Sequence, residues 1–429
     1  MMMRILYDIL FLIFSLFYLP FFIIKGKHKD GFWERFGVVP DAVKKTLAGK
    51  KVIWIHAVSV GEMIQAIRLT NALRKKAADL RFVLTATTAA GKGIAEKFKA
   101  TEDIVLYFPV DFRMSVSRFI RSVLPQAVII LETEIWPNLL AELAGRKVPI
   151  TLMNGRISDS AMPKYKVMKF FLKPVLKHLT WVGAQDEVMK ARFLELGLEP
   201  GKISVTGNMK YDWSPPTLKD DEAEQIEKII KTPGSILCIA GSTHEGEEEM
   251  LFDVYKTLKA KVPVFKLLIA PRHLDRIESI QAQAYRRDLI LQKVSKLLRS
   301  SDKSAHDVEV FLLDKMGVLA NLYGIADFVF VGGSLVPHGG HNLIEPAYYE
   351  KPVVFGCFME NFREMAEEFK KAQAAIEVQD KEGLRNAFSR LIEETATCHK
   401  LGVAAKKLIA LHQGATERNI RAVMQLISA

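Results

Sequence analysis

Short apolar runs alternate with helical patterns along most of the chain. The runs are rich in β-branched residues and nearly continuous, as in strands that a parallel sheet buries on both faces. The stretches between them repeat apolar residues every three or four positions, which is typical of helices. The runs predicted as strands are residues 52–58, 82–87, 104–108, 127–131, 150–153, 181–184, 203–205, 236–240, 265–270, 289–291, 308–313, 328–331, 353–355 and 375–378. This alternation predicts an α/β protein with parallel sheets.

The length of the chain predicts more than one domain. A chain of 429 residues is too long for one ordinary hydrophobic core. We predict an N-terminal anchor in residues 1–30, a first doubly wound, Rossmann-like domain in 31–213, a linker in 214–234, a second such domain in 235–403, and a C-terminal helix in 404–429 that can pack back on the first. Such domains bind ligands at the carboxyl ends of their strands, so we expect the two to face a central cleft.

The N-terminal segment is apolar. Residues 5–24 would span about 30 Å as a helix, the thickness of a hydrocarbon core, although Asp8 would cost about 3 kcal/mol at its centre. No small-residue cleavage site follows, and three lysines in residues 25–29 outnumber the single Arg4 before the segment. This pattern predicts an uncleaved signal-anchor with the bulk of the chain in the cytoplasm. Whether the segment spans the membrane or lies in its interface stays open.

Charge is uneven along the chain. Residues 1–213 hold 32 Lys and Arg against 19 Asp and Glu, whereas the remainder holds 28 against 30. Within the basic part, residues 163–178 carry five lysines and no acid, in a pattern that predicts one helix kinked at Pro174. Four of these lysines form one stripe: Lys166, Lys169, Lys173 and Lys177. The stripe is either a solvated helix face or, beside an anchor, a surface for anionic lipid, and we predict no nucleic-acid partner.

Several common catalytic patterns are incomplete. The P-loop, the zinc-protease helix, the nucleophile elbow and the glycine fingerprint of dinucleotide-binding domains each fail at one or more positions. Three cysteines, odd in number and far apart, give neither a disulfide framework nor a zinc spacing. His338 and His341 lack a matching cluster of ligands. We therefore predict neither a metal nor a cofactor.

Charged residues follow the predicted strands of the first domain. Ser59 and Glu62 form a capping box, but Glu62 is also a candidate general base, whose ionised form the helix N-terminus would favour. Glu132 and Glu134 follow the fourth strand, and we expect only one of them to face the ligand. Lys210, after the last strand, is either a surface lysine or a cation at the site.

The second domain carries signals for an anionic ligand. Arg272 follows a strand and offers a fork of donors suited to phosphate. A strand, a glycine-rich loop and a helix start follow one another in residues 328–345, the arrangement of a phosphate cradle. Glu345 has the wrong charge for phosphate, but it could accept hydrogen bonds from ribose hydroxyls.

These patterns together resemble one family, the 3-deoxy-D-manno-octulosonic acid (Kdo) transferases of lipid A biosynthesis. The motifs that carry the resemblance, in the family's order, are ERFG, HAVSVGE, ETEIWPN, NGRISDSA, TGNMKYD, STHEGEE, PRH, MGVLANLYGIADFVFVGGSLV and GGHNLIEPA. The resemblance covers nearly the whole chain. It implies an inverting, metal-independent transferase of the GT-B type at the cytoplasmic face of the inner membrane. Its reaction would move Kdo from CMP-Kdo to the glucosamine disaccharide of a lipid A precursor.

The resemblance also assigns roles to residues. It implies that Glu62 is the general base and that Glu132 and Lys210 stabilise the transition state. The positions implied to contact the CMP donor are Arg272, His273, Gly317, Val318, Leu319, Asn342, Leu343, Ile344 and Glu345. Val318 stands where relatives can carry Glu, so contact there would be through the backbone. Two alternatives stay open: a transferase or epimerase of the same fold that uses a UDP-sugar, and a lipid A binder or scaffold without activity.

Overall fold

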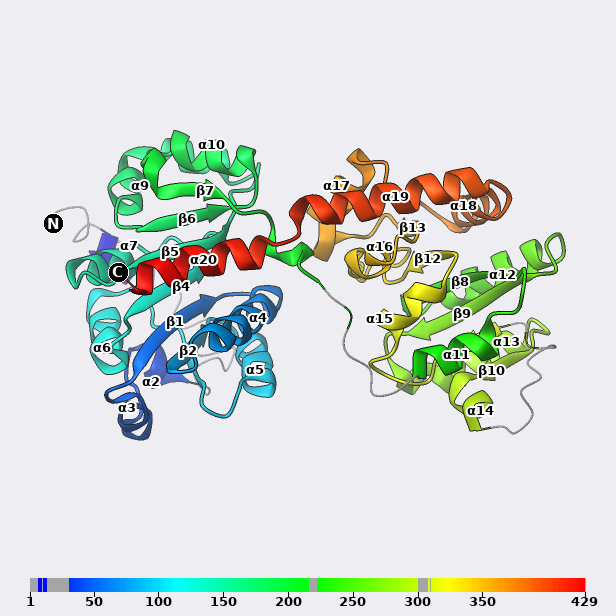
Figure 1. Ribbon diagram of the computed structural model, residues 1–429, viewed down its shortest axis with the longest axis horizontal. Helices are drawn as coiled ribbons and strands as arrows, with labels where there is room; N and C mark the ends of the chain where they lie inside the picture. Colours follow the sequence, from blue (N-terminus) through cyan, green and yellow to red (C-terminus); the bar gives the residue numbers. More distant parts are fainter. Residues whose placement is uncertain are drawn as a thin grey trace. The chain divides into compact units, whose positions relative to one another are not determined.

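The computed structural model comprises two compact units, Met1–Asp212 with His412–Ala429, and Trp213–Leu411 (Figure 1). The residues that the structure describes are 7–9, 11–13, 31–213, 215, 222–299, 308 and 310–428. They are called unit 1 and unit 2.

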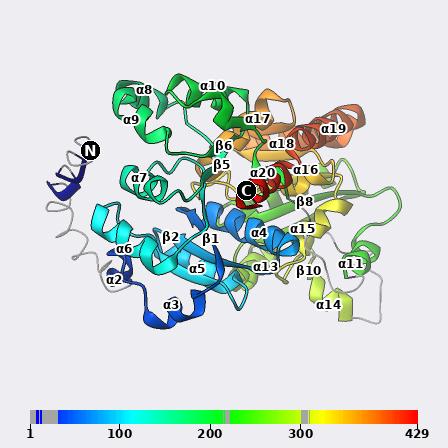
Figure 2. The same ribbon diagram turned by 60° about the vertical axis from the view of Figure 1, so that its left-hand side comes forward.

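Unit 1 is built on one parallel seven-stranded sheet with the order β3-β2-β1-β4-β5-β6-β7. Its strands are β1 Lys51–Ala57, β2 Leu80–Ala86, β3 Ile104–Tyr107, β4 Ala127–Leu131, β5 Ile150–Gly155, β6 Trp181–Ala184 and β7 Ile203–Val205. Its helices are α2 Phe32–Arg35, α3 Asp41–Leu47, α4 Val60–Lys76, α5 Ala89–Phe98, α6 Arg113–Val123, α7 Pro137–Gly145, α8 Met162–Val167, α9 Lys169–Leu176, α10 Glu187–Glu195 and α20 Ala415–Ser428. The C-terminal helix α20 packs beside α4 (Figure 2).

Unit 2 repeats this plan with a second parallel sheet, of order β10-β11-β9-β8-β12-β13-β14. Its strands are β8 Ile236–Thr243, β9 Phe265–Pro271, β10 Leu291–Lys293, β11 Val310–Leu312, β12 Phe328–Val331, β13 Val353–Gly356 and β14 Ala375–Val378. Its helices are α11 Glu222–Ile230, α12 Glu247–Lys259, α13 Ile277–Tyr285, α14 Val294–Arg299, α15 Leu319–Leu322, α16 Ile344–Tyr348, α17 Arg363–Lys371, α18 Lys381–Glu393 and α19 Thr395–His412. The prediction of an α/β protein with parallel sheets is confirmed.

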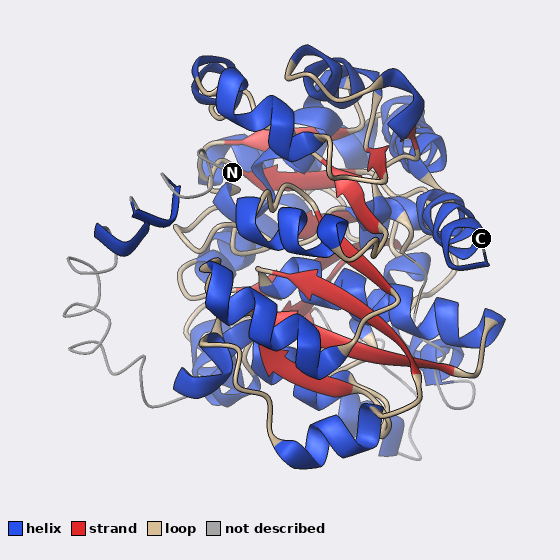
Figure 3. Ribbon diagram, turned by 90° about the vertical axis from the view of Figure 1, so that its left-hand side faces the viewer, coloured by secondary structure: helices blue, strands red, loops and turns tan. Residues whose placement is uncertain are grey.

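Burial on both faces explains why the strands are continuously apolar. In β1, Val52 and Trp54 belong to one hydrophobic cluster, whereas Ile53, Ile55 and Ala57 belong to another. Successive side chains of a strand point to opposite faces, so the two clusters are the cores on the two sides of one sheet. Helices cover the strands on both sides (Figure 3). A strand in this position has no polar face to present to water.

Each sheet has a central point at which the chain order reverses, and in unit 2 β11 is in addition inserted between β9 and β10. In unit 1 the reversal lies between β1 and β4, and in unit 2 it lies between β8 and β12. Crossover helices leave in opposite directions at such a point, which opens a crevice beyond the carboxyl ends of the two strands. The segments after β1, β4, β8 and β12 are therefore where ligand-binding groups are expected.

The predicted anchor, residues 5–24, lies mostly outside the described residues. Among the parts of the chain that the structure describes, no helix is both long and apolar enough to cross a membrane. Of the predicted segment, residues 7–9 and 11–13 are helical. Asp8 accepts a hydrogen bond of 2.6 Å from the Asn138 side chain at the start of α7, and the ring of Tyr7 stacks on Phe171 of α9.

The lysine-rich segment differs from its prediction. It forms two short helices, α8 and α9, that meet at Met168, where the backbone angles are φ −86° and ψ 7°. Pro174 lies inside α9 and does not mark the break, so the predicted kink was wrong in position. Leu172, Val175 and Leu176 are buried, which anchors α9 to unit 1. The four stripe lysines are all exposed.

Candidate active site

Glu62 lies in the first turn of α4, directly after β1. The Ser59 hydroxyl accepts a hydrogen bond from the Glu62 backbone N–H (3.2 Å), and Glu62 Oε2 accepts one from the Val58 N–H (2.8 Å). The helix cap that the sequence predicted is thus present. The residue is only 8% exposed, so a carboxylate is held firmly at the reversal point of the sheet.

A second carboxylate, Glu132, follows β4, the strand next to β1. Its Oε1 accepts an ion-pair contact from Lys210 Nζ at 2.8 Å, and its Oε2 lies 3.7 Å from Arg156. Glu132 has a φ of +58°, a left-handed conformation that costs a residue with a Cβ about 1–2 kcal/mol. Its backbone N–H donates to the Met153 carbonyl at 2.9 Å, which holds this conformation.

The expectation that only one of Glu132 and Glu134 would face the site was wrong. The left-handed turn at Glu132 ends the extended strand, and alternate residues of an extended segment share a face in any case. Both carboxylates lie close enough to Glu62 for their charges to interact. Burial, with repulsion from Glu62, raises the pKa of Glu134 to about 7. Three carboxylates therefore gather at one edge of the sheet.

The acidity of Glu62 also differs from its prediction. Burial, followed by repulsion from Glu132, raises the pKa of the Glu62 carboxyl above its usual value. Hydrogen bonds from Val58 and Ser59 act in the opposite direction but do not prevail. Desolvation thus outweighs the help that the helix N-terminus gives to the ionised form. A carboxylate with a raised pKa is a stronger base than an ordinary glutamate.

Lys210 is positioned by buried amides that the sequence analysis did not single out. It lies in the 3-10 turn Met209–Tyr211, whose Met209 N–H donates to Asn154 Oδ1 at 2.9 Å. The same Asn154 donates through Nδ2 to Gln65 Oε1 (3.2 Å), one turn after Glu62 in α4. Asn154 is fully buried with a φ of +57°. Asparagine adopts this conformation more readily than most residues, and that was the one signal in the motif NGRISDSA.

In unit 2, the predicted donor-binding residues follow adjacent strands. Arg272 and His273 are exposed at the end of β9. Gly317, with a φ of +89°, turns the chain after β11, and Asn342 Oδ1 accepts from the Ile344 N–H (3.1 Å) at the start of α16. Because β11, β9, β8 and β12 are neighbours in that order, these segments share the carboxyl edge of the sheet.

Not all of these residues can contact a ligand through their side chains. Leu343, Ile344 and Val318 are at most 2% exposed. Only their backbone groups are available to a bound molecule, as predicted for Val318. Leu319 and Glu345 are half-buried, and Asn342 Nδ2 donates to Glu345 Oε1 at 3.3 Å. The polar groups on offer are thus Arg272, His273 and Asn342 with its neighbouring N–H groups.

A buried carboxylate holds the loop after β12 in place. Glu247, in the first turn of α12, is fully buried and accepts backbone hydrogen bonds from four residues: His244, Gly333, Ser334 and Leu335, at 2.7–3.0 Å. Its neighbour Glu248 forms a two-pronged ion pair with Arg276, at 2.7 and 3.0 Å. Neither role could be predicted from the sequence, because an acidic first turn of a helix is common.

Four histidines meet at this edge of unit 2. The Nε2 atoms of His244 and His341 are 3.0 Å apart, and the His338 ring stacks on His244 with 4.2 Å between ring centres. The His273 ring lies at 5.7 Å, nearly perpendicular to that of His244. In the described residues, no three His, Cys, Asp or Glu side chains are arranged to hold a metal ion.

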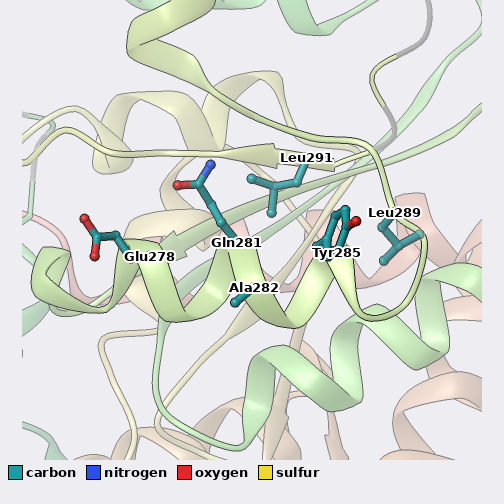
Figure 4. A pocket seen from close by; sticks show the side chains of 6 residues that line it. All are labelled: Glu278, Gln281, Ala282, Tyr285, Leu289 and Leu291. Carbon is teal, nitrogen blue, oxygen red and sulfur yellow. The ribbon is translucent and has the colours of Figure 1, made fainter.

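A shallow pocket lies elsewhere in unit 2, along α13 and the start of β10 (Figure 4). It is lined by Glu278, Gln281, Ala282, Tyr285, Leu289 and Leu291. Leu289 and Leu291 stand at the amino end of β10, away from the carboxyl edge that holds the charged groups. This pocket contains none of the predicted site residues.

The fold of this chain matches a known glycosyltransferase, and its sequence matches a family of transferases. The glycosyltransferase from Rickettsia africae ESF-5 matches with a TM-score of 0.52 over 88% of this chain and 99% of that one, at 14% identity, so the fold is one that glycosyltransferases use. Residues 30–213 match the family described as 3-deoxy-D-manno-octulosonic-acid transferase (kdotransferase). The 3-deoxy-D-manno-octulosonic acid transferase of Haemophilus influenzae is 33% identical over 400 residues, 91% of this chain and 90% of that protein. The chain therefore belongs to the Kdo transferase family and is a glycosyltransferase.

A further relative is longer than this chain. The bifunctional glycosyltransferase/methyltransferase of Fusobacterium nucleatum subsp. nucleatum is 34% identical over 373 residues, 85% of this chain. The match spans 57% of that relative. The resemblance that the motifs carried is thus confirmed by matches along most of the chain.

Proposed function

We propose that this enzyme transfers Kdo from CMP-Kdo to the glucosamine disaccharide of a lipid A precursor, with inversion at the anomeric carbon and release of CMP. The observation that carries the proposal is the convergence of Glu62 with the Glu132–Lys210 ion pair at the reversal point of the unit 1 sheet. A base beside a fixed cation suits the attack of a hydroxyl group on an acidic sugar.

Glu62 is the proposed general base. The hydroxyl oxygen of the acceptor attacks the anomeric carbon of Kdo, and its proton passes to the Glu62 carboxylate. The bond from that carbon to the CMP phosphate breaks, with the electron pair left on the phosphate oxygen. One Glu62 oxygen accepts from the Val58 N–H, which fixes the carboxylate, and its pKa is raised by burial. Lys210, held by Glu132, would offset the Kdo carboxylate or an acceptor phosphate.

Unit 2 is the proposed donor-binding domain. Arg272 and the N–H groups at the start of α16, beside Asn342, are donors suited to the phosphate of CMP. Such donors typically contribute about 3 kcal/mol each to stabilising developing charge. Because protein donors carry the charge of the leaving group in this mechanism, we expect turnover to be unaffected by EDTA.

The test is incubation of the full chain with CMP-Kdo and a tetra-acylated lipid A precursor, with products resolved by mass. Glu62→Gln should lower kcat about 100-fold or more while binding of both substrates is retained, because only proton transfer is removed. Glu96→Gln, an exposed carboxylate of α5, is the matched control and should keep wild-type activity. Turnover from UDP-sugars alone would instead support the UDP-sugar alternative. Wild-type turnover that Glu62→Gln leaves unchanged would contradict the proposed base, whereas a scaffold would show no turnover in either protein.

The exposed lysines of α8 and α9 support a second proposal, that this surface contacts anionic lipid on the cytoplasmic face of the inner membrane. Phe170 and Val167, 87% and 88% exposed, lie among them. An exposed aromatic side chain beside several lysines is typical of a surface that rests on a bilayer. The predicted signal-anchor, residues 5–24, would hold the same unit at the membrane.

The lipid contact is tested with liposomes of anionic phospholipid. We expect changing Lys166, Lys169, Lys173 and Lys177 together to Gln to weaken association, most strongly at low salt, because screening already weakens such contacts at high salt. Four exposed lysines elsewhere in unit 1 serve as the control: Lys44, Lys45, Lys50 and Lys75. Equal binding by both variants at every ionic strength would reject this surface.

A further inference from the structure

The histidines of unit 2 form a cluster at the reversal point of its sheet. His244 directly follows β8, and His341 lies in the loop after β12. The strands β8 and β12 are neighbours, and the chain order reverses between them. Their carboxyl ends therefore flank the crevice where doubly wound domains bind ligands.

The two sides of the cluster are held by one carboxylate. Glu247 Oε2 accepts both the His244 N–H, at 2.9 Å, and the Gly333 N–H, at 2.7 Å. Gly333 has a φ of +64°, and a Cβ there would lie 3.2 Å from the rings of both His244 and His341. Glycine at this position thus gives the pair its room, and Glu247 sets the separation of the two segments.

The charges that face the pair are mainly basic. From the end of β9 come Arg272 and His273, from the turn before α13 comes Arg276, and from the β12 loop comes His338. Among the acids of α12, Glu247 accepts backbone N–H groups and Glu248 is paired with Arg276. Burial, reinforced by these neighbouring bases, lowers the pKa of both His244 and His341 to about 4. Both imidazoles are therefore neutral at neutral pH.

The contact between the two rings limits what the pair can bind. Only one of two facing Nε2 atoms can carry a proton, because two N–H groups cannot point at each other. A single added proton gives the cluster one positive charge, which a nearby anion would stabilise. In the proposed reaction, CMP leaves with one more negative charge than its phosphate carries in CMP-Kdo, because the electron pair of the broken bond stays on that phosphate.

We propose that the His244–His341 pair is a subsite for the phosphate of the released nucleoside monophosphate, and that it takes up one proton from solvent when the phosphate dianion binds. This inference rests on the proposed function for the identity of the nucleotide, CMP. It assigns a role in leaving-group binding to two residues outside the predicted donor-contact set.

The test measures proton uptake during CMP binding to the full wild-type chain. Isothermal titration at pH 7 in buffers of different ionisation enthalpy should show uptake of about one proton per CMP bound. At this pH the phosphate of CMP is already mostly a dianion, since its second pKa is about 6, so the proton is taken up by the protein. Cytidine, which lacks the phosphate, should bind without uptake. Absence of uptake with CMP, or equal uptake with cytidine, would overturn the proposal.

Single-residue variants test whether the histidine pair is the site that takes up the proton. His244→Asn and His341→Asn should each abolish most of the uptake and weaken CMP binding about 10-fold, whereas cytidine binding should not change. His399→Asn, an exposed histidine of α19, is the matched control and should behave as the wild type. If uptake persists in both variants, the proton binds elsewhere and the pair has no such role.

The outcome is separate from that of the proposed function. The titration uses neither Kdo nor an acceptor, and Glu62→Gln should show the same proton uptake as the wild type. Failure of CMP to bind at all would reject the CMP-Kdo donor itself. CMP binding without proton uptake would reject only the histidine subsite.

Discussion

At the scale of single residues, the arrangement of carboxylates in unit 1 determines which group can act as a base. Glu132 forms an ion pair with Lys210 at 2.8 Å, whereas the pKa values of Glu62 and Glu134 are set mainly by burial. A buried carboxyl without a cation partner keeps its proton to a higher pH. Burial therefore raises the pKa of both Glu62 and Glu134, that of Glu134 to about 7.

Removing the charge of Glu132 should change the acidity of Glu62. Repulsion from Glu132 helps to raise the pKa of Glu62, so Glu132→Gln should lower that pKa. We expect the acid limb of the profile of kcat/KM against pH to move to lower pH, with a lower maximum because Lys210 loses its partner. A limb that stays in place would show that Glu62 does not control it. Glu96→Gln is again the control.

Glu134 should make stability depend on pH in the direction opposite to an ordinary salt-bridged acid. Its pKa rises from 4.5 to about 7 in the folded chain, so the native state holds this proton more tightly than the unfolded state. Its contribution is complete below pH 4.5 and is lost as pH rises through 7. Between pH 5 and pH 8, the wild type should therefore lose about 2 kcal/mol relative to Glu134→Gln. Parallel thermal melts of both proteins at the two pH values test this, and equal shifts would contradict it.

A site residue could be identified from the sequence only where a local motif surrounds it. Glu62, Glu132 and Lys210 stand in distinctive motifs at predicted strand ends, and the structure places them there. The role of Asn154 could not be predicted, because it comes from contacts with Gln65 and Met209, which are far from it in sequence. No local pattern encodes a partnership of that kind. The roles of Glu62, Glu132 and Lys210 in catalysis stay predictions.

At the scale of elements, the segments that connect strands to helices are held by buried polar groups. Glu247 places α12 and the β12 loop in register by accepting four backbone N–H groups. Its pKa is raised by burial, while those N–H groups oppose the shift. The loop that presents His341 thus depends on one side chain from another element.

Glu247→Gln should destabilise unit 2. The amide nitrogen of glutamine would face two N–H donors that now bind a carboxylate oxygen, which leaves buried donors unpaired. We expect the free energy of unfolding of unit 2 to fall by about 2–3 kcal/mol. Glu249→Gln changes an exposed neighbour on the same helix, paired with Arg287, and should cost about 0.5 kcal/mol or less. Equal melting temperatures for the two variants would refute the role given to Glu247.

The strands could be predicted closely, whereas the helices in the basic segment could not. Every predicted strand corresponds to a strand of one of the two sheets, with ends that differ by a few residues. Burial on both faces leaves an unbroken apolar run, a signal that tertiary contacts do not override. The break at Met168 has no such signal, because the burial of Leu172 and Leu176 sets the direction of α9, and proline is tolerated at position 174.

At the scale of the whole molecule, the two chain segments that make up unit 1 are joined by hydrogen bonds and by a ring contact. Asp212 accepts backbone hydrogen bonds from Gly414, at 2.6 Å, and from Thr416. Arg418 donates to the Thr206 carbonyl at 2.7 Å, and the ring of Tyr211 stacks on His412. The C-terminal segment thus braces the turn that carries Lys210.

Asp212→Ala should lower both the stability of unit 1 and the rate of catalysis. We expect unit 1 to lose about 2 kcal/mol of stability, because two N–H groups at the start of α20 lose their acceptor. The value of kcat should fall about 3–10-fold with KM for the proposed donor, CMP-Kdo, unchanged, since Lys210 lies two residues away. Asp79→Ala, an exposed carboxylate paired with Lys51, is the control. Unaltered kcat with lowered stability would mean that the brace does not reach the site.

The division of the chain has a consequence for how the enzyme is made. Residues 213–411 of unit 2 are synthesised before the last eighteen residues of unit 1, His412–Ala429, leave the ribosome. Domains generally fold as they emerge, so unit 2 can reach its native state while unit 1 still lacks α20. A nascent chain stalled or cleaved before α20 would then carry a folded unit 2 beside an incomplete unit 1, and would hold the donor proposed for unit 2 without transferring its sugar.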